Sequence, residues 1–476
     1  MVEATKAGFL DRTLRNLRNA WQSIAGSEYG AETASMRPHL PDDDIPRLRE
    51  QMLACLAARG GEVSARARAA ALGRAYLNLD ETGRRRFLTV LAQEFDVDRA
   101  AVDAAIAAVQ AAADPDARHH AEARLKKAME APRLRLLTQF SALPNGIKFL
   151  VDMRAELLSL ARQDPLFKPV EADLKGLLAS WFDVGLLELQ EITWRSASAA
   201  LLERLIAYEA VHAIKGWDDL KNRLASDRRC FAFFHPRMPD EPLIFVEVAL
   251  VAGLADNVQH LLDESVPVQD PQKADTAIFY SISNAQKGLA GISFGNFLIK
   301  RVVDLLALEF KGLKTFATLS PVPGFRPWLE HALSDGEPRL LLPAERKALT
   351  QVADGSRGAK GTLKVLIGDV ATWHQDPAVC QALRGPLMRL CARYLTQERR
   401  SDGKAKDPVA HFHLTNGARM ERLNWLADTS ANGLQQSAGI MINYLYKLGE
   451  IDDNHEAYTG AGKIAASSAI RSLAKG

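Results

Sequence analysis

Residues 278–325 constrain the fold and function of this chain more than any other stretch. They predict a strand over 278–283, a glycine-containing loop, a helix from about 295 to 310, and a second strand over 315–319. The second strand leads into Ser320, which begins a turn that contains two prolines. Glycines before a helix expose backbone N–H groups to an anion. A serine at a strand end with a proline-fixed exit is well placed to hold a reacting group. The segment therefore predicts a phosphate-binding loop beside a catalytic position.

The glycine loop does not carry either of the two best-known phosphate motifs. It lacks the Gly-Lys-Ser/Thr of a P-loop, and its glycines do not follow the Gly-x-Gly-x-x-Gly spacing of dinucleotide-binding folds. Gly288, Gly291 and Gly295 would still let a diphosphate approach the backbone, and the dipole of the following helix would favour it. The alternative is an ordinary strand-to-helix connection without a ligand, and the loop alone leaves both open.

Composition predicts an ordinary globular protein. The length of 476 residues suggests two or three domains, and 47% hydrophobic with 25% charged residues is typical of globular proteins. A net charge of +2 argues against a general affinity for nucleic acid. No run of 18 apolar residues exists, so no membrane span is expected. Four scattered cysteines fit a reducing compartment, and with no targeting signal recognised we expect a cytoplasmic protein.

The texture of the chain changes near residue 183, which predicts two domains, 1–183 and 184–476. The first reads as amphipathic helices joined by short loops, which is typical of a helical bundle. The second alternates strands and helices and is predicted to be α+β. Its other expected elements are strands over 230–234, 243–251, 411–414 and 423–427, a mobile loop over 353–362, and a final helix over 436–448.

His411 and His413 form a second motif. In the expected strand, two histidines separated by one residue would point to the same face and could bind a metal. No third ligand lies nearby in the sequence, although Asp428 could approach in space. We favour a structural hydrogen bond for one histidine and proton transfer for the other, and we expect no metal.

Ser320 taken alone is ambiguous. Most serines that precede a proline are simply turn residues. The Gly-x-Ser-x-Gly elbow is absent, which argues against an α/β-hydrolase.

Several stretches together resemble the malonyl-CoA decarboxylase family. They are residues 233–239, 247–250, 279–283, 295–303, 319–325, 411–413, 416–418 and 424–428, with weaker matches at 143–146 and 149–154. The resemblance implies a helical N-terminal domain that helps build oligomers and a C-terminal domain of the GNAT (N-acetyltransferase) type. It also implies conversion of malonyl-CoA to acetyl-CoA and CO₂ without a metal or organic cofactor.

The resemblance also assigns site residues. The catalytic serine of the family corresponds to Ser320 and its catalytic histidine to His413, while a further serine falls on Ser281 and a tyrosine on Tyr446, in the expected last helix. The coenzyme-binding loop corresponds to Ala290, Gly291, Ile292, Ser293, Phe294, Gly295 and Asn296. Vertebrate members have a glutamate where this chain has Ser293, so any proton handling by that glutamate is absent or reassigned here.

The expected mechanism is loss of CO₂ to an enolate, which backbone donors stabilise and a Ser320/His413 dyad protonates. One rival reading is a CoA-dependent acyltransferase with Glu247 as general base, and another is a non-catalytic acyl-CoA sensor. The expected partners are malonyl-CoA and acetyl-CoA, with no nucleic acid and no membrane, and the chain is expected to form a homodimer or homotetramer. Oligomer size, acceptance of methylmalonyl-CoA and the physiological pathway stay open at this stage.

Overall fold

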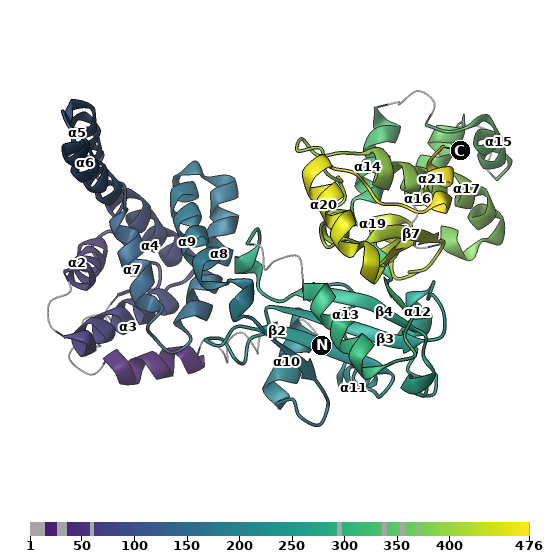
Figure 1. The fold of residues 1–476 in the computed structure, drawn as a ribbon, viewed down its shortest axis with the longest axis horizontal. Coiled ribbons are helices and arrows are strands. Elements are labelled where there is room, and N and C mark those ends of the chain that lie inside the picture. Colours follow the sequence, from purple (N-terminus) through teal and green to yellow (C-terminus); the bar gives the residue numbers. More distant parts are fainter. Residues whose placement is uncertain are drawn as a thin grey trace. The chain divides into compact units, whose positions relative to one another are not determined.

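The computed structural model describes residues 15–25, 36–57, 61–292, 298–335, 340–352, 358–368 and 372–475. The chain divides into two compact units (Figure 1). The first contains residues 1–188, 233–243 and 284–294, and the second contains 189–232, 244–283 and 295–476. The segment that begins the glycine loop therefore groups with the helical unit. The boundary at residue 183 stays a prediction.

The first unit is helical, as predicted. A helix over residues 15–25 is followed by α2 (Ile45–Leu56), α3 (Glu62–Asn78), α4 (Glu81–Glu94), α5 (Arg99–Ala111), α6 (Pro115–Ala128), α7 (Pro132–Phe140), α8 (Gly146–Gln163) and α9 (Lys168–Trp181). Asp80, Asp98 and Asp114 accept backbone N–H groups at the starts of α4, α5 and α6. Helices α5 and α6 lie side by side as a hairpin (Figure 1).

An aromatic cluster forms the core of this unit. The Trp21 ring is fully buried and meets the Phe149 ring edge-on at 4.9 Å. Phe149 also contacts Tyr76 and Phe140 edge-on. Such contacts add to the burial of the rings, and here they join four helices.

The second unit is built on a mixed sheet, so the α+β class predicted for the C-terminal part is confirmed. The strands are β1 (Glu188–Ile192), β2 (Arg228–Phe234), β3 (Ile244–Val251), β4 (Thr276–Asn284), β5 (Thr315–Thr318), β6 (Ser320–Pro321), β7 (Arg419–Asn424) and β8 (Met441–Leu445). Their order is β1-β2-β3-β4-β5-β8-β6, with β7 paired to β8. Strands β4 and β5 are parallel, whereas β8 runs antiparallel to β5, β6 and β7.

The helices of the second unit follow or connect these strands. They are α10 (Ala199–Tyr208), α11 (Trp217–Arg223), α12 (Val258–Leu261), α13 (Leu298–Glu309), α14 (Phe325–Ser334), α15 (Pro343–Gln351), α16 (Gly358–Gly368), α17 (Pro377–Gln397), α18 (Pro408–Thr415), α19 (Ala431–Ser437), α20 (Ile451–Ala461) and α21 (Ser468–Lys475). No helix in the described segments is long and apolar enough to cross a membrane.

Strand β4 extends beyond its partner β5. The paired register runs from Thr276 opposite Thr315 to Phe279 opposite Thr318, and one further bond joins the Leu319 N–H to the Phe279 carbonyl. Strand β4 nevertheless continues to Asn284. Past Phe279, β4 therefore has no β5 partner in the paired register.

Two predicted elements around the histidine motif are wrong. Residues 411–414 lie in helix α18, which Asp407 caps and Pro408 begins. Residues 436–448 do not form one helix, because α19 ends at Ser437 and the chain turns through Ala438 with φ of 52°. Strand β8 follows this turn, so Tyr446 comes directly after a strand.

Two further boundaries differ from the predictions. The strand expected over 423–427 is β7, which ends at Asn424. Much of the loop expected over 353–362 is helical, since α16 begins at Gly358, and residues 353–357 lie outside the described residues. The expected helix start near 295 also falls outside them, and α13 is described from Leu298.

Candidate functional site

Ser320 and His413 lie in hydrogen-bonding contact. The Ser320 Oγ is 3.1 Å from the His413 Nε2, although 93 residues separate them in the chain. Strand β6 presents the serine and helix α18 presents the histidine. Both side chains are buried, with 6% and 3% exposure. The structure thus brings together the two residues that the resemblance assigned to catalysis.

The contact extends at both ends into a chain of four side chains. The Ser320 hydroxyl donates to the Thr318 Oγ1 at 2.9 Å. On the other side, the His413 Nδ1 lies 2.8 Å from the Tyr446 hydroxyl. The ring of Tyr444 stacks on His413 with centroids 4.4 Å apart. Tyr446 therefore extends the Ser320–His413 pair and ends the row of hydrogen bonds on the histidine side.

Burial keeps the four hydrogen-bonded side chains uncharged. Desolvation lowers the pKa of His413 to about 3 and raises the pKa of Tyr446 well above its usual value. Because the Ser320 hydroxyl donates to Thr318, its oxygen is left to accept the N–H of His413 Nε2. The His413 Nδ1 then accepts the Tyr446 O–H. A proton can move along this chain without forming an imidazolium.

Asp407 holds the segments of Ser320 and His413 together. Its Oδ1 accepts the N–H groups of Val409 and Ala410 at 3.0 and 2.9 Å and so caps α18. Its Oδ2 accepts the N–H of Gly324, in the turn after Ser320, at 3.1 Å. The side chain is 1% exposed. Asp407 was not predicted from the sequence, although an aspartate before a proline is a recognisable signal for a helix start.

The histidine pair does not share a face. In a helix, residues i and i+2 lie about 200° apart around the axis. His411 accordingly points elsewhere, with its Nδ1 2.8 Å from the Tyr458 hydroxyl. Asp428, the proposed third ligand, bonds to Gln259 and to the Ser430 N–H. The described residues contain no group of three side chains suited to a metal.

Ser281 is engaged with Glu209 rather than with Ser320. Its Oγ lies 2.8 and 2.9 Å from the two Glu209 oxygens. Ser283 and the backbone N–H groups of Val211 and His212 also donate to this carboxylate. Ser281 and Glu209 are both buried. The family serine at this position therefore anchors a buried carboxylate, which the sequence analysis did not foresee.

The described part of the glycine loop is clamped to α8. Arg154 is 1% exposed, and its guanidinium donates to the carbonyls of Gly288 and Ala290 at 2.5 and 2.9 Å. A Cβ at Gly288 would lie 1.7 Å from the Val151 carbonyl oxygen, so only glycine fits there. Gly291 has φ of 73°, a conformation that favours glycine.

The N–H groups of the loop are partly used. Those of Leu289, Ala290 and Ile292 donate to carbonyls of the preceding turn. These three N–H groups are therefore not available to an anion, whereas no such bond is made by the Gly291 N–H within the described residues, and Ser293, Phe294, Gly295 and Asn296 lie outside them. Lys175 of α9 does reach the loop, because a Cβ at Gly291 would lie 3.6 Å from its Nζ. This cation was not foreseen from the sequence.

Glu247, the base of the rival acyltransferase reading, belongs to a buried ion-pair cluster. Its Oε2 is 3.0 Å from the Arg223 guanidinium, which also pairs with Asp219. Burial raises the pKa of Glu247 to about 8, while Arg223 acts in the opposite direction. The side chain is 1% exposed, so it is poorly placed to meet an incoming amine.

Comparison with known proteins gives a consistent family assignment. The family models for the malonyl-CoA decarboxylase N-terminal and C-terminal domains match residues 95–182 and 185–476. Mitochondrial malonyl-CoA decarboxylase from Anser anser anser is 38% identical over 423 residues, covering 85% of this chain and 83% of the relative. The enzyme of the same name from Rattus norvegicus is 40% identical over 415 residues, covering 84% and 83%.

Solved structures agree with the sequence relatives. Malonyl-CoA decarboxylase from Rhodopseudomonas palustris superposes with a TM-score of 0.82 at 43% identity, covering 90% of this chain and 99% of that one. The protein from Agrobacterium vitis gives 0.79 at 43% identity, with the same coverage.

Proposed function

This chain belongs to the malonyl-CoA decarboxylase family, and we propose that Ser320, His413 and Tyr446 carry out its reaction. The chain is a carboxy-lyase that converts malonyl-CoA to acetyl-CoA and CO₂. The observation that carries the assignment of the site is the buried hydrogen-bonded chain from Ser320 through His413 to Tyr446.

The reaction needs little from the protein beyond placement and a proton. When the bond between C2 and the carboxylate breaks, its electrons move onto C2 and the thioester oxygen. The thioester is thus its own electron sink. The protein has to hold the carboxylate perpendicular to the thioester plane, stabilise the enolate oxygen, and protonate C2.

The neutral chain can supply this proton. In this mechanism the Ser320 O–H turns from Thr318 to C2, the N–H of His413 Nε2 replaces it on Ser320, and the Tyr446 O–H replaces it on Nδ1. The enolate is a stronger base than each of these groups. Tyr446 is left as a phenolate, and one proton from solvent restores its O–H and balances the reaction. The low pKa of His413 supports a relay without an imidazolium.

The thioester is expected to lie along β4. Beyond Phe279 this strand has no β5 partner in the paired register, so its backbone donors there are suited to the thioester oxygen. For the coenzyme, the proposed binding segment is the loop from Ala290 to Asn296. Support for a diphosphate at this loop comes from the Lys175 amine beside Gly291.

The decisive test is an assay with malonyl-CoA as sole substrate. Ser320→Ala and His413→Asn are each expected to lower kcat by about 10²- to 10⁴-fold with little change in KM, because they remove proton transfer and not binding. Ser334→Ala, an exposed serine of α14, is the matched control and should keep wild-type turnover. Near-normal turnover in both site variants would rule out the proposed site.

The same assay separates the rival functions. A CoA-dependent acyltransferase would need an added amine and would release no CO₂, and its candidate base Glu247 is held by Arg223. An acyl-CoA sensor would bind the ester without turnover.

Assembly and location are part of the proposal. The chain is expected to form a homodimer or homotetramer, which light scattering after gel filtration would measure. A cytoplasmic location is proposed from the sequence, whereas the names of the animal relatives place those proteins in mitochondria. Cell fractionation would distinguish the two.

A further inference from the structure

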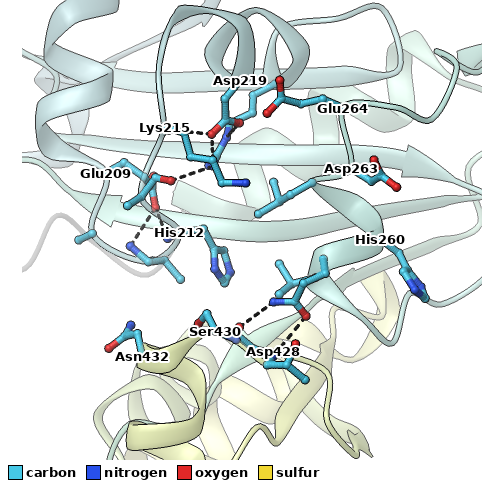
Figure 2. Close-up of a pocket in the computed structure, with 18 of the residues that line it drawn as sticks. Glu209, His212, Lys215, Asp219, His260, Asp263, Glu264, Asp428, Ser430 and Asn432 are labelled. Atoms are coloured by element: carbon cyan, nitrogen blue, oxygen red, sulfur yellow. Dashed lines mark hydrogen bonds and ion pairs between the residues drawn. The ribbon is translucent and has the colours of Figure 1, made fainter. Parts of the chain in front are cut away.

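A cavity of about 1110 Å³ in the second unit is lined by none of the side chains to which the proposed reaction assigns a proton-transfer step (Figure 2). Its walls come from three segments: residues 209–223 after α10, residues 258–265 around α12, and residues 428–432 before and within α19. Neither Ser320 nor His413 lines it. Its size is typical of small-molecule sites, and its lining combines apolar residues such as Val211 and Leu262 with the polar and charged residues labelled in Figure 2.

His212 has a ring nitrogen that lacks a hydrogen-bond partner in this cavity. The side chain is 9% exposed, and its Nε2 is buried without a hydrogen-bond partner among the described residues. Burial lowers the pKa of the ring, which is therefore neutral, and the Tyr280 backbone hydrogen-bonds to it. Because Nε2 has no partner, the N–H donated to that backbone lies on Nδ1. The Nε2 consequently carries a lone pair that accepts no hydrogen bond.

Two buried carboxylates flank this ring, and Arg223 is close enough to act on the pKa of His212 in the opposite direction. Figure 2 shows His212 between Glu209 and the segment of Asp428 and Ser430. Both carboxylates pull the pKa of His212 upward, which reflects their closeness. Glu209 accepts bonds from hydroxyl and backbone N–H donors. The bonds that Asp428 accepts come from an amide and a backbone N–H.

The cations of the cavity wall do not compensate these charges. Arg223 is committed to Asp219 and Glu247. Lys215 lines the wall as well, but so do Asp263 and Glu264, and the balance of the wall stays negative. A buried acceptor without a donor and a buried negative charge without a cation both cost free energy. The site therefore lacks a hydrogen-bond donor and a positive charge.

We propose that this cavity binds the ammonium group of a small organic amine, with one N–H donated to the His212 Nε2 and the positive charge set between Asp428 and Glu209. A primary ammonium has three donors and no acceptor, which matches an orphaned lone pair between two carboxylates. A metal ion fits less well, because the described residues offer no group of three ligands. This site goes beyond the decarboxylation and does not depend on it.

Three ligands of similar shape and different charge test the proposal. Butylamine, 1-butanol and butyrate are titrated separately into the full-length protein by isothermal calorimetry at pH 7.5. Butylamine is expected to bind, and the alcohol and the carboxylate are not. Asp428→Asn, which keeps an oxygen acceptor for Gln259 and Ser430, and His212→Phe, which keeps the ring shape, should each weaken amine binding by about tenfold or more.

Lys215→Gln is the matched control, because it removes a positive charge from the same wall and should leave amine binding equal or tighter. Equal binding of butylamine and 1-butanol would overturn the proposal in favour of an apolar pocket. Binding of butyrate, lost in Lys215→Gln, would make the cavity an anion site. Absence of butylamine binding in the wild-type protein would show that water alone fills it. Thermal melts establish whether each variant folds, and the wild-type series stands if one does not.

Discussion

Replacing His413 by glutamine should remove part of the acid sensitivity of the fold. The folded-state pKa of His413 is about 3, whereas an unfolded histidine titrates near 6.5. Between these values the unfolded chain binds one proton more than the folded chain, so stability rises with pH across this window. The contribution is complete above about pH 6.5 and is lost progressively as the pH falls towards 3.

The size of the effect follows from the same two values. Lowering the pH from 8 to 5 should cost the wild-type protein about 2 kcal/mol through His413 alone. His413→Gln is less stable than wild type at pH 8, because it disturbs the contacts to Ser320 and Tyr446, but it escapes this loss. Urea unfolding followed by circular dichroism at both pH values gives the double difference.

Tyr446→Phe is the control for this experiment. It loses the hydrogen bond to Nδ1 but keeps the buried imidazole, so a pH-dependent loss of similar size should remain. If wild type and His413→Gln lost the same free energy of unfolding between pH 8 and 5, the ring would not be held neutral, and the relay without an imidazolium would be refuted.

Three further predictions concern the groups around the site. Asp407→Asn should lower kcat at least tenfold with KM nearly unchanged and should also lower the melting temperature, because the amide can still cap α18 but its buried NH₂ faces the Gly324 N–H and neither donor has an acceptor; a parallel rise in KM would contradict this. Gly288→Val should lower the melting temperature or abolish soluble expression, since its Cβ would meet the Val151 carbonyl at 1.7 Å; a wild-type melting curve would count against the clamp. Lys175→Gln should raise KM for malonyl-CoA several-fold, less so at high salt, with kcat unchanged, and a KM equal to wild type would remove Lys175 from the coenzyme site.

Much of the fold was predictable where local signals were strong. Strands β2, β3, β4 and β5 were each predicted within two residues of their ends, because runs rich in aromatic and β-branched residues are bounded by turn residues. Helix α18 was missed, since polar and apolar side chains alternate from His411 to Leu414 and imitate a strand. Strand β8 was missed because a short apolar run does not distinguish strand from helix by period.

The site was predictable only in part. Ser320 and the pair of His411 and His413 were candidates from their local sequence, but the choice of His413 as the partner of Ser320 came from the family resemblance, because nothing local in the sequence pairs two residues 93 positions apart. The roles of Glu209, Asp407 and Arg154 depend on partners that only tertiary packing brings near, such as the Gly288 carbonyl 134 residues from Arg154. A sequence pattern can mark such residues as candidate caps or charges, but it cannot identify what they hold.

The hydrogen bonds of Asp407 to two separate segments have a consequence for grafting this site into another protein. The turn after Ser320 and the start of α18 share a single carboxylate, one oxygen for each. The two segments therefore behave as one interchangeable part although they are far apart in the chain. In a chimera that takes only one of the two segments from a relative, Asp407 would no longer fit both of its hydrogen-bond partners. Exchanging both segments together with Asp407 should preserve the distance between the serine and the histidine.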